Sequence, residues 1–254
     1  LLAEYQGTGY LLQAAQAICA QRADVHFVLA GYPNVERYRR LAQELGIQDR
    51  TIAVSPVGCA VFMYYYLDVG NTQAAHGRAP AVAIGHKTAN PDAIVVSYQG
   101  DGDLASIGLA EIVQGAQMGL PMTFIFVNNA IYGMTGGQMA PTTLPNMVTT
   151  SSPYGRDVAR QGHPVRVCEL VSQLDGAAYV VRRAGHRPAE VRKLRKAIKT
   201  AFQVQLAGLG FSLIEVLSNC PTNWGMKPVE SNKWLEENML PYYPLGEYKT
   251  PESS

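Results

Sequence analysis

The sequence predicts an α/β fold: a mainly parallel sheet flanked by helices. Three observations predict it. Short runs rich in β-branched residues alternate with helical stretches, the 254 residues are enough for one large α/β domain, and a hydrophobic content of 47% is enough for a full core. Strands that alternate with helices are joined by crossovers and therefore run parallel. Such sheets bind ligands at the carboxyl ends of their strands, so we expect functional residues there.

The expected strands are short apolar runs without helical periodicity. Residues 93–98 and 122–127 are continuous runs of this kind, which is typical of strands buried on both faces. Residues 211–217 are expected to be the last strand of the core. The remaining strand candidates are residues 26–29, 51–54 and 178–182.

Helices are expected at the stretches between these runs. Residues 36–45 form a polar helix that Gly46 ends, residues 78–87 a helix that Asn90 and Pro91 end, and residues 188–206 an amphipathic helix. Residues 104–118 and 165–174 are expected to be helical as well. Between them, a loop from Asn128 to about Pro164 is rich in Gly, Pro, Thr and Ser, and loops of that length are usually functional or disordered.

Charge and cysteine usage exclude several classes of protein. The net charge is +1 with mixed signs, which predicts no nucleic-acid partner. The one basic cluster is interpreted as a solvated helix face; it comprises Arg192, Lys193, Arg195, Lys196 and Lys199. There is no apolar run long enough to cross a bilayer and no visible secretory leader, and the four cysteines are widely spaced. We therefore expect a cytoplasmic protein without membrane contact.

The first buried strand runs directly into Gly100, Asp101, Gly102 and Asp103, and a helix is expected to follow. Glycines at such a turn let the backbone approach a phosphate, and a helix N-terminus offers N–H groups to an anion. Asp101 repels a phosphate unless a hard cation lies between them, which is how Mg²⁺ binds carboxylates and phosphates together. Asn129 ends the next parallel strand at the same sheet edge, so its amide oxygen can reach that metal.

Gly-Asp-Gly followed, one crossover later, by Asn-Asn resembles the thiamine diphosphate motif. Further segments resemble the β subunit of 2-oxoacid:ferredoxin oxidoreductases, and together they cover the chain from about residue 45 to its end. These segments are His76-Gly77-Arg78-Ala79-Pro80, Lys87 with Ala89-Asn90-Pro91, Tyr132-Gly133-Met134-Thr135-Gly136-Gly137-Gln138, Pro141-Thr142-Thr143 and Cys220-Pro221-Thr222. Residues 152–157 and 219–224 resemble the branched-chain (2-oxoisovalerate) type more than the pyruvate type.

The resemblance implies a subunit that binds thiamine diphosphate and Mg²⁺ for the oxidative decarboxylation of a 2-oxoacid. Coenzyme A then takes the acyl group and ferredoxin takes the electrons. The implied magnesium ligands are Asp101, Asn129 and the carbonyl of Ile131. The implied cofactor-binding residues are Gly100, Asp101, Gly102, Asp103, Asn129, Tyr132, Thr135, Gly136 and Gln138.

Several of these implied roles have alternatives. The loop of residues 133–138 would wrap the diphosphate, with Thr135 and Gln138 donating hydrogen bonds, or it would be a plain flexible turn. His76 and Arg78, the candidate catalytic residues, would face the substrate carboxylate or the diphosphate, or form a structural network. Lys87 is expected to be a surface or interface cation.

The chain offers no glutamate that the motif places near the aminopyrimidine ring. Glu111 and Glu169 are expected to be exposed. By resemblance, this glutamate belongs to a separate pyrimidine-side α subunit, so the active site would lie at a subunit interface. Residues 1–220 would form the diphosphate-binding domain, with residues 1–45 uncertain, and the aromatic-rich residues 221–254 an arm on the partner subunit. The alternative is an arm packed on its own core.

Cys59 and Cys220 stand at two of the positions that hold a [4Fe–4S] cluster in the family, which needs four thiolates. The family's early Cys-x-x-Cys pair is absent. Residues 6 to about 33 look more like the start of the α subunit. Either the cluster is lost or the natural N-terminal region differs. Cys19 and Cys168 are expected to be core residues.

Two other classes of protein remain as rivals. A non-redox thiamine enzyme usually fuses both thiamine domains in a chain about twice as long, so the 254 residues argue against it. A non-catalytic assembly subunit has no use for a metal site, so the pair of Asp101 and Asn129 argues against that class.

Overall fold

A computed structural model describes residues 51–65 and 70–251 of the chain. The strand expected at residues 26–29, the helix expected at residues 36–45 and Cys19 lie outside the described residues.

The described residues form one seven-stranded sheet in the order β2-β1-β3-β4-β6-β5-β7. All neighbouring strands are parallel except β5 and β7. The mainly parallel sheet predicted from the sequence is therefore confirmed. The strands are β1 (Thr51–Ser55), β2 (Gly70–Gln73), β3 (Ile94–Gln99), β4 (Thr123–Asn128), β5 (Ala177–Ala184), β6 (Phe211–Leu217) and β7 (Gly246–Lys249).

Helices cover both faces of the sheet. On one face, α3 (Ala79–Ala89), α4 (Leu109–Met118) and α6 (Val167–Ser172) pack on apolar strand residues such as Phe124 and Leu213. On the other face, α7 (Pro188–Leu206) packs on the intervening strand residues. The bounds of α7 and β6 are those that the sequence predicts, because α7 presents Ala197, Ala201 and Val204 to the sheet at helical spacing.

The helix expected over residues 104–118 is divided in two. A π-helical segment, η3 (Asp101–Ile107), comes first, and α4 begins after Gly108. The N–H of Gly108 donates to the carbonyl of Asp103, which closes the wide turn. A Cβ atom at residue 108 would lie 2.4 Å from that carbonyl oxygen, so only glycine fits there.

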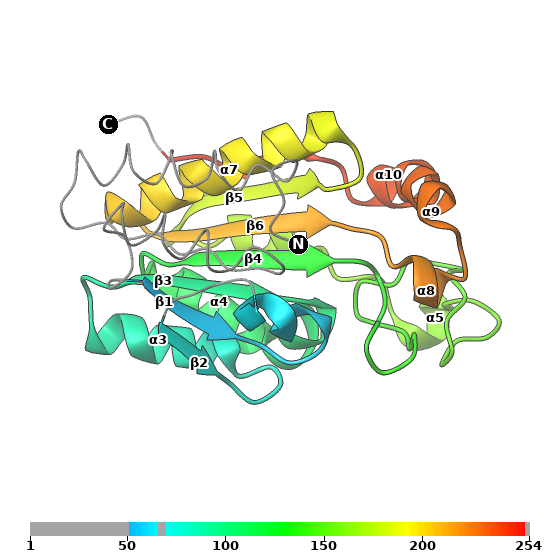
Figure 1. Cartoon of the computed structure of the whole chain (residues 1–254), viewed down its shortest axis with the longest axis horizontal. Coiled ribbons are helices and arrows are strands. Elements are labelled where there is room, and N and C mark those ends of the chain that lie inside the picture. Colours follow the sequence, from blue (N-terminus) through cyan, green and yellow to red (C-terminus); the bar gives the residue numbers. More distant parts are fainter. Residues whose placement is uncertain (1–50, 66–69, 252–254) are drawn as a thin grey trace.

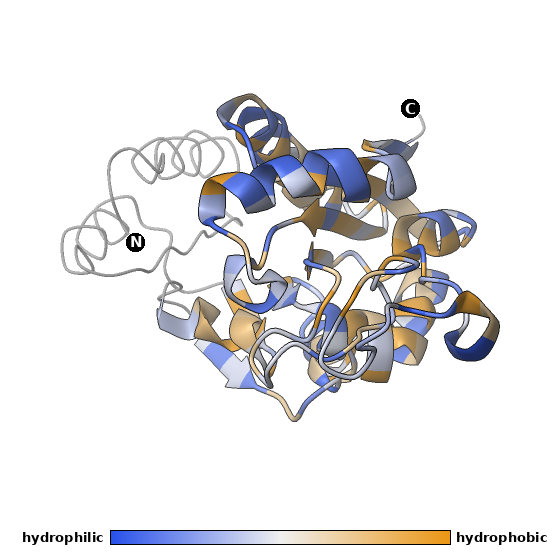
Figure 2. Cartoon of the chain, turned by 90° about the vertical axis from the view of Figure 1, so that its right-hand side faces the viewer, coloured by the Kyte–Doolittle hydropathy of each residue, from blue (hydrophilic) through white to orange (hydrophobic). Residues whose placement is uncertain are grey.

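The carboxyl ends of the strands gather the short helices that the sequence pattern did not predict. Figure 1 shows α5 (Val158–Gln161), α8 (Pro221–Trp224), α9 (Pro228–Trp234) and α10 (Leu240–Tyr242) at the end to which the arrows of β4, β5 and β6 point. The 3-10 helix η2 (Cys59–Tyr65) follows β1, and the π-helix η4 (Leu235–Met239) joins α9 to α10. In Figure 2, which faces this end, hydrophobic residues concentrate in the interior and hydrophilic residues on the outer helices.

The long loop of residues 128–164 is organised around a buried arginine. Arg156 is 4% exposed, and its guanidinium donates to the carbonyls of Pro141, Thr143 and Gly162, among others. A buried arginine needs acceptors for its N–H groups, and here the loop's own backbone provides them. The loop is therefore a folded part of the carboxyl edge.

The C-terminal tail packs on its own sheet. Leu235, Met239 and Tyr243 are fully buried and form one apolar cluster with Leu217 of β6 and with neighbouring residues. β7 adds to the sheet beside β5. This arrangement corresponds to the alternative in which the tail packs on its own core. Contact of its exposed residues, such as Val229, with a partner subunit stays a prediction.

Over the described ranges, a search for an apolar helix of membrane-spanning length finds none.

Candidate functional site

A cavity of about 300 Å³ opens at the carboxyl edge of the sheet, where β1, β3 and β4 end. It lies where parallel α/β sheets bind their ligands. The lining residues are Val57, Gly58, Cys59, Ala60, His76, Tyr98, Gly100, Asp101, Gly102, Asp103, Val127, Asn129, Ile131, Tyr132, Gly133, Met134 and Thr135. Most of the site residues predicted from the sequence are therefore brought together. Arg78, Gly136, Gln138 and Cys220 do not line this cavity.

Asp101 is a buried carboxylate at the floor of this cavity. Its Oδ1 atom accepts a hydrogen bond from the hydroxyl of Thr142, and its Oδ2 atom accepts one from the N–H of Asn129 at 3.2 Å. Burial raises the pKa of Asp101 to about 7, and the nearby charge of Glu215 adds to the rise, although the two hydrogen bonds oppose it. Within the described ranges, no cationic side chain forms an ion pair with Asp101. A buried carboxylate without a cation beside it fits a metal ligand.

Asn129 follows β4 and heads a tight turn that lines the same cavity. Its Oδ1 atom accepts a hydrogen bond from the N–H of Ile131 at 3.3 Å, which leaves the second lone pair of this oxygen available. Asn128 accepts a hydrogen bond from the N–H of Ala130 at 3.0 Å, and Ala130 has a φ of 59°. The turn thus joins the carboxylate of Asp101 through the N–H of Asn129, and both residues line the cavity.

Asp103 joins three segments of the site. Its Oδ1 atom accepts a hydrogen bond from the N–H of Gly77 at 2.7 Å and lies 3.1 Å from Nδ1 of His76. Its Oδ2 atom accepts a hydrogen bond from the N–H of Val57 at 3.1 Å. Both oxygens of Asp103, predicted as a cofactor-binding residue, are therefore bonded within the chain. The result of these bonds is a fixed position for the His76 ring.

The ring of His76 lies against Gly102, in the turn of residues 100–103. A Cβ atom at Gly102 would lie 2.9 Å from Cε1 of His76, so no larger residue fits there without moving the ring. Since Nδ1 is next to Asp103, the Nε2 atom of His76 is left for a ligand in the cavity. This geometry supports the role of His76 at a ligand rather than in a purely structural network.

Arg78, by contrast, forms an ion pair with Glu111, at the start of α4. This contact corresponds to the structural-network alternative for Arg78. The expected exposure of Glu111 and Glu169 is wrong, since their side chains are 24% and 31% exposed. Both are half-buried because each pairs with an arginine.

The interpretation of Lys87 as a surface or interface cation is also wrong. Lys87 is 6% exposed, and its Nζ atom donates to the carbonyls of Pro91 and Ala93, each at 2.7 Å. It satisfies the backbone between α3 and β3. Burial lowers the pKa of the Lys87 ammonium, with the nearby charge of Asp92 opposing this.

The loop of residues 132–138 is closed on itself. The N–H of Tyr132 donates to the carbonyl of Gln138, and the N–H of Gly137 donates to the carbonyl of Tyr132. The hydroxyl of Thr135 donates to Oε1 of Gln138 at 2.6 Å, and Nε2 of Gln138 donates to the carbonyl of Thr135 at 2.8 Å. These two side chains bond each other, and a contact with a diphosphate stays a prediction.

Cys59 and Cys220, far apart in the sequence, meet beside Gly133. A Cβ atom at Gly133 would lie 3.4 Å from Sγ of Cys59 and 3.5 Å from Sγ of Cys220, so the sulfurs are no farther apart than the sum of these distances. Burial and the proximity of Cys220 raise the pKa of the Cys59 thiol. No group of three or more His, Cys, Asp or Glu residues arranged to hold a metal occurs in the described part of the chain. Cys168 is fully buried in the core, as predicted.

Two residues with contacts to the candidate metal ligands were missed by the sequence reasoning. Thr142 donates to Asp101, and the indole N–H of Trp224 donates to the carbonyl of Asn129 at 3.2 Å. Thr142 was visible as part of the Pro141-Thr142-Thr143 segment, but no pattern shows that its hydroxyl reaches a carboxylate 41 residues away. Trp224 was interpreted only as an interface aromatic.

Comparison with known proteins agrees with this geometry. Residues 56–216 match the model of the thiamine pyrophosphate enzyme C-terminal domain, the domain that binds thiamine pyrophosphate, another name for thiamine diphosphate. The ketoisovalerate oxidoreductase subunit VorA of Methanothermobacter thermautotrophicus is 50% identical over 206 residues, which are 81% of this chain and 43% of VorA. The chain thus spans less than half the length of that relative.

Two further relatives are covered over most of their length. The 2-oxoglutarate synthase subunit KorB of Archaeoglobus fulgidus is 38% identical over 212 residues, which are 82% of this chain and 75% of KorB. A solved structure of 2-oxoglutarate:ferredoxin oxidoreductase from Magnetococcus marinus matches with a TM-score of 0.68 and 29% identity, over 86% of this chain and 77% of that one. The chain therefore belongs to the thiamine pyrophosphate enzymes and, among them, to the family of 2-oxoacid:ferredoxin oxidoreductase subunits that carry the thiamine pyrophosphate-binding domain.

Proposed function

We propose that this chain holds the diphosphate of thiamine diphosphate through one Mg²⁺ ion, as a subunit of a 2-oxoacid:ferredoxin oxidoreductase. The observation that carries the proposal is the buried, cation-free carboxylate of Asp101, which accepts a hydrogen bond from the N–H of Asn129 at the cavity that both residues line. The carboxylate of Asp101, the amide oxygen of Asn129 and the carbonyl of Ile131 would hold the ion. Oxygen ligands from one carboxylate and neutral groups, completed by phosphate oxygens, suit Mg²⁺.

The remaining residues of the cavity would bind and orient the cofactor. No heavy atom lies within 4 Å of a Cβ position at Gly100, so a phosphate could approach the backbone there. His76, held by Asp103 at Nδ1, would donate a hydrogen bond from Nε2 to an anionic oxygen in the cavity when its ring carries both protons. Thiamine diphosphate, when bound, supplies the carbon nucleophile that attacks a 2-oxoacid.

We infer a branched-chain substrate, 2-oxoisovalerate. The segments 152–157 and 219–224 support it, as does the higher identity to the ketoisovalerate subunit than to the 2-oxoglutarate subunit. Coenzyme A would take the acyl group. Ferredoxin would take the electrons through a [4Fe–4S] cluster to which Cys59 and Cys220 contribute two thiolates. The enzyme would act in the cytoplasm.

The pyrimidine-side α subunit would complete the site. The described part of the chain places no glutamate in the cavity, so the residue that acts on the aminopyrimidine must come from elsewhere. The test is to purify the chain alone and together with that subunit, and to measure decarboxylation of 2-oxoisovalerate with ferredoxin as acceptor. We expect turnover only from the assembly. A chain that decarboxylates the substrate alone contradicts the shared site.

A further inference from the structure

The C-terminal arm, residues 221–249, is connected to the candidate metal site through three sets of contacts. The first contact comes from α8. The indole N–H of Trp224 donates to the carbonyl of Asn129 at 3.2 Å, across 95 residues of sequence. This carbonyl belongs to a residue that lines the cavity. Trp234 of α9 lies beside Trp224, with 4.6 Å between the ring centroids, and no hydrogen bond from its indole to the turn occurs in the described structure.

The second contact comes from the end of α10. Tyr243 is fully buried, and its hydroxyl donates to the carbonyl of Thr142 at 2.8 Å. The hydroxyl of Thr142 donates to Asp101. The arm therefore fixes the residue that orients the carboxylate of the site.

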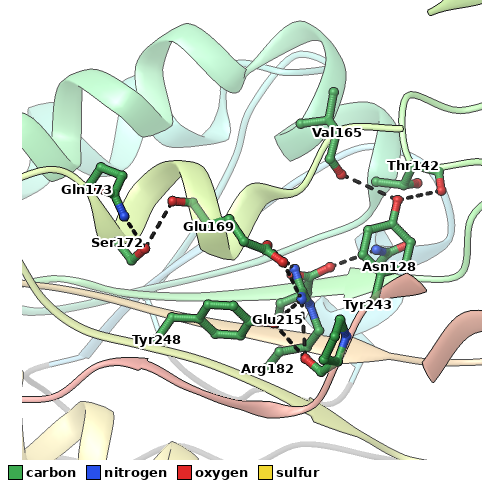
Figure 3. A network of polar contacts seen from close by, with 11 residues as sticks. Asn128, Thr142, Val165, Glu169, Ser172, Gln173, Arg182, Glu215, Tyr243 and Tyr248 are labelled. Carbon is green, nitrogen blue, oxygen red and sulfur yellow. Dashed lines mark hydrogen bonds and ion pairs between the residues drawn. The ribbon is translucent and has the colours of Figure 1, made fainter. Parts of the chain in front are cut away.

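The third contact passes through a buried network, which Figure 3 shows. The carbonyl of Pro244 and the hydroxyl of Tyr248 both accept hydrogen bonds from the guanidinium of Arg182. Arg182 donates to Glu215 at 2.8 Å, and Glu215 accepts a hydrogen bond from Asn128 at 2.7 Å. Asn128 then accepts from the N–H of the next turn residue, Ala130. The arm thus connects to the backbone of the turn.

The turn needs such support. Ala130 has a φ of 59°, which is sparsely populated for a residue with a Cβ atom, and such conformations persist only where surrounding contacts enforce them. Both of its polar backbone groups are bonded: the N–H to Asn128 and the carbonyl to the hydroxyl of Thr143 at 2.6 Å. A metal ligand on this turn keeps its position only as long as these contacts hold.

We propose that the C-terminal arm is a positioning element of the metal site, in which Trp224 holds the Asn129–Ile131 turn and Tyr243 holds Thr142 against Asp101. The proposal rests on the proposed magnesium site. It gives the arm a task inside its own subunit: preorganising the ligand oxygens before the ion and the diphosphate arrive.

The test compares two variants with two matched controls. Tyr243→Phe removes the hydroxyl and keeps the ring, and Trp224→Phe removes the N–H and replaces the indole with a smaller aromatic ring. Trp234→Phe and Tyr242→Phe make the same chemical changes at the neighbouring aromatic residues, for which the described structure shows no hydrogen bond to the turn or to Thr142. All four are made in the assembled enzyme, and their thermal unfolding is recorded to confirm that they fold.

Two quantities are measured. In the assembled enzyme, titration with Mg²⁺ in the presence of thiamine diphosphate gives the metal affinity. We expect Trp224→Phe and Tyr243→Phe each to weaken it about 3- to 10-fold, the effect of one net hydrogen bond, and the controls to leave it unchanged. In the cofactor-free full chain, amide hydrogen exchange is followed in the peptide that contains residues 128–134. We expect faster exchange in the two variants only.

The two readouts separate the possible failures. If the wild-type enzyme binds no Mg²⁺ with thiamine diphosphate while the exchange pattern is as expected, the proposed function is wrong and the link between arm and turn stands. If the wild-type enzyme binds both and the variants match their controls in affinity and exchange, the arm does not position the site and the inference is overturned.

Discussion

Arg182 and Glu215 form an ion pair in which both side chains are fully buried, with 2.8 Å between Nε and Oε2. They are register neighbours on β5 and β6 and point to the face that α6 covers, from which Glu169 adds a second carboxylate. Burial alone would lower the pKa of the Arg182 guanidinium, but the two carboxylates raise it above its ordinary value. The charge of Glu215 also reaches Asp101 and raises its pKa. A cation bound at Asp101 would offset this repulsion.

Removal of the arginine leaves the buried Glu215 and the half-buried Glu169 without their cation. Arg182→Met should lower the free energy of unfolding by about 3–5 kcal/mol, the usual effect of breaking a buried pair. Arg187→Met breaks the pair of a largely exposed arginine with Glu236 and should change it by about 0–1 kcal/mol. Urea unfolding of the wild type and the two variants measures both changes in the free energy of unfolding. Equal losses of unfolding free energy in the two variants would show that the buried pair stabilises the fold no more than the exposed pair does.

Lys87 provides a prediction about pH. Because burial lowers its pKa from the ordinary 10.5, the folded state loses this proton at a lower pH than the unfolded state does. In that window, just below 10.5, the unfolded state binds more protons, so the contribution of Lys87 to stability rises with pH. The neutral amine still has two N–H groups for Pro91 and Ala93. The stability advantage of the wild type over Lys87→Met should thus grow as the pH rises toward 10.5, as urea unfolding measures. An advantage that shrinks over this range contradicts the assignment.

The helices and strands could be predicted from the sequence where an apolar run or a helical periodicity extends over the whole element. The apolar runs that became β3, β4 and β6 and the periodicity of α7 were sufficient, because burial of whole faces determines them. β2 and β7 were missed, since edge strands of four residues such as Gly70–Gln73 carry no apolar run.

The site was predictable in part for a similar reason. Asp101 and Asn129 were found because strand ends and parallel topology bring them together. The contacts of Thr142 and Trp224 could not be found, because they are hydrogen bonds from single side chains to a carboxylate or a carbonyl far away in the sequence. The local contacts of Lys87 were missed because they depend on how the chain turns between α3 and β3. Such contacts depend on tertiary packing and leave no period in the sequence.

The thiols of Cys59 and Cys220 provide a prediction about iron. Enzyme isolated without oxygen should contain a [4Fe–4S] cluster, with two further thiolates completing the set of four. Cys59→Ala and Cys220→Ala should each lose iron and visible absorbance, whereas Cys168→Ala, in the core, should keep both. Iron analysis and visible absorbance spectra check this. An iron-free wild-type enzyme would remove the ferredoxin-linked electron route.

Substrate preference gives a further prediction. The assembled enzyme should have a higher kcat/KM for 2-oxoisovalerate than for 2-oxoglutarate or pyruvate. Steady-state assays with the three acids at equal ferredoxin concentration measure it. A highest value for pyruvate would mean that the segments 152–157 and 219–224 do not mark the branched-chain type.

The central claim is that Asp101 holds the cation that holds the diphosphate, and the most direct measurement is calorimetric titration of thiamine diphosphate with and without Mg²⁺. Asp101→Asn keeps the shape and removes the charge, and Asp175→Asn makes the same change at an exposed residue. In the assembled enzyme, the wild type and Asp175→Asn should bind the cofactor tightly only with Mg²⁺. Asp101→Asn should lose more than the about 10- to 100-fold that an outer-shell partner costs, and addition of Mg²⁺ should no longer help it. Unchanged, magnesium-dependent affinity in Asp101→Asn would contradict the account.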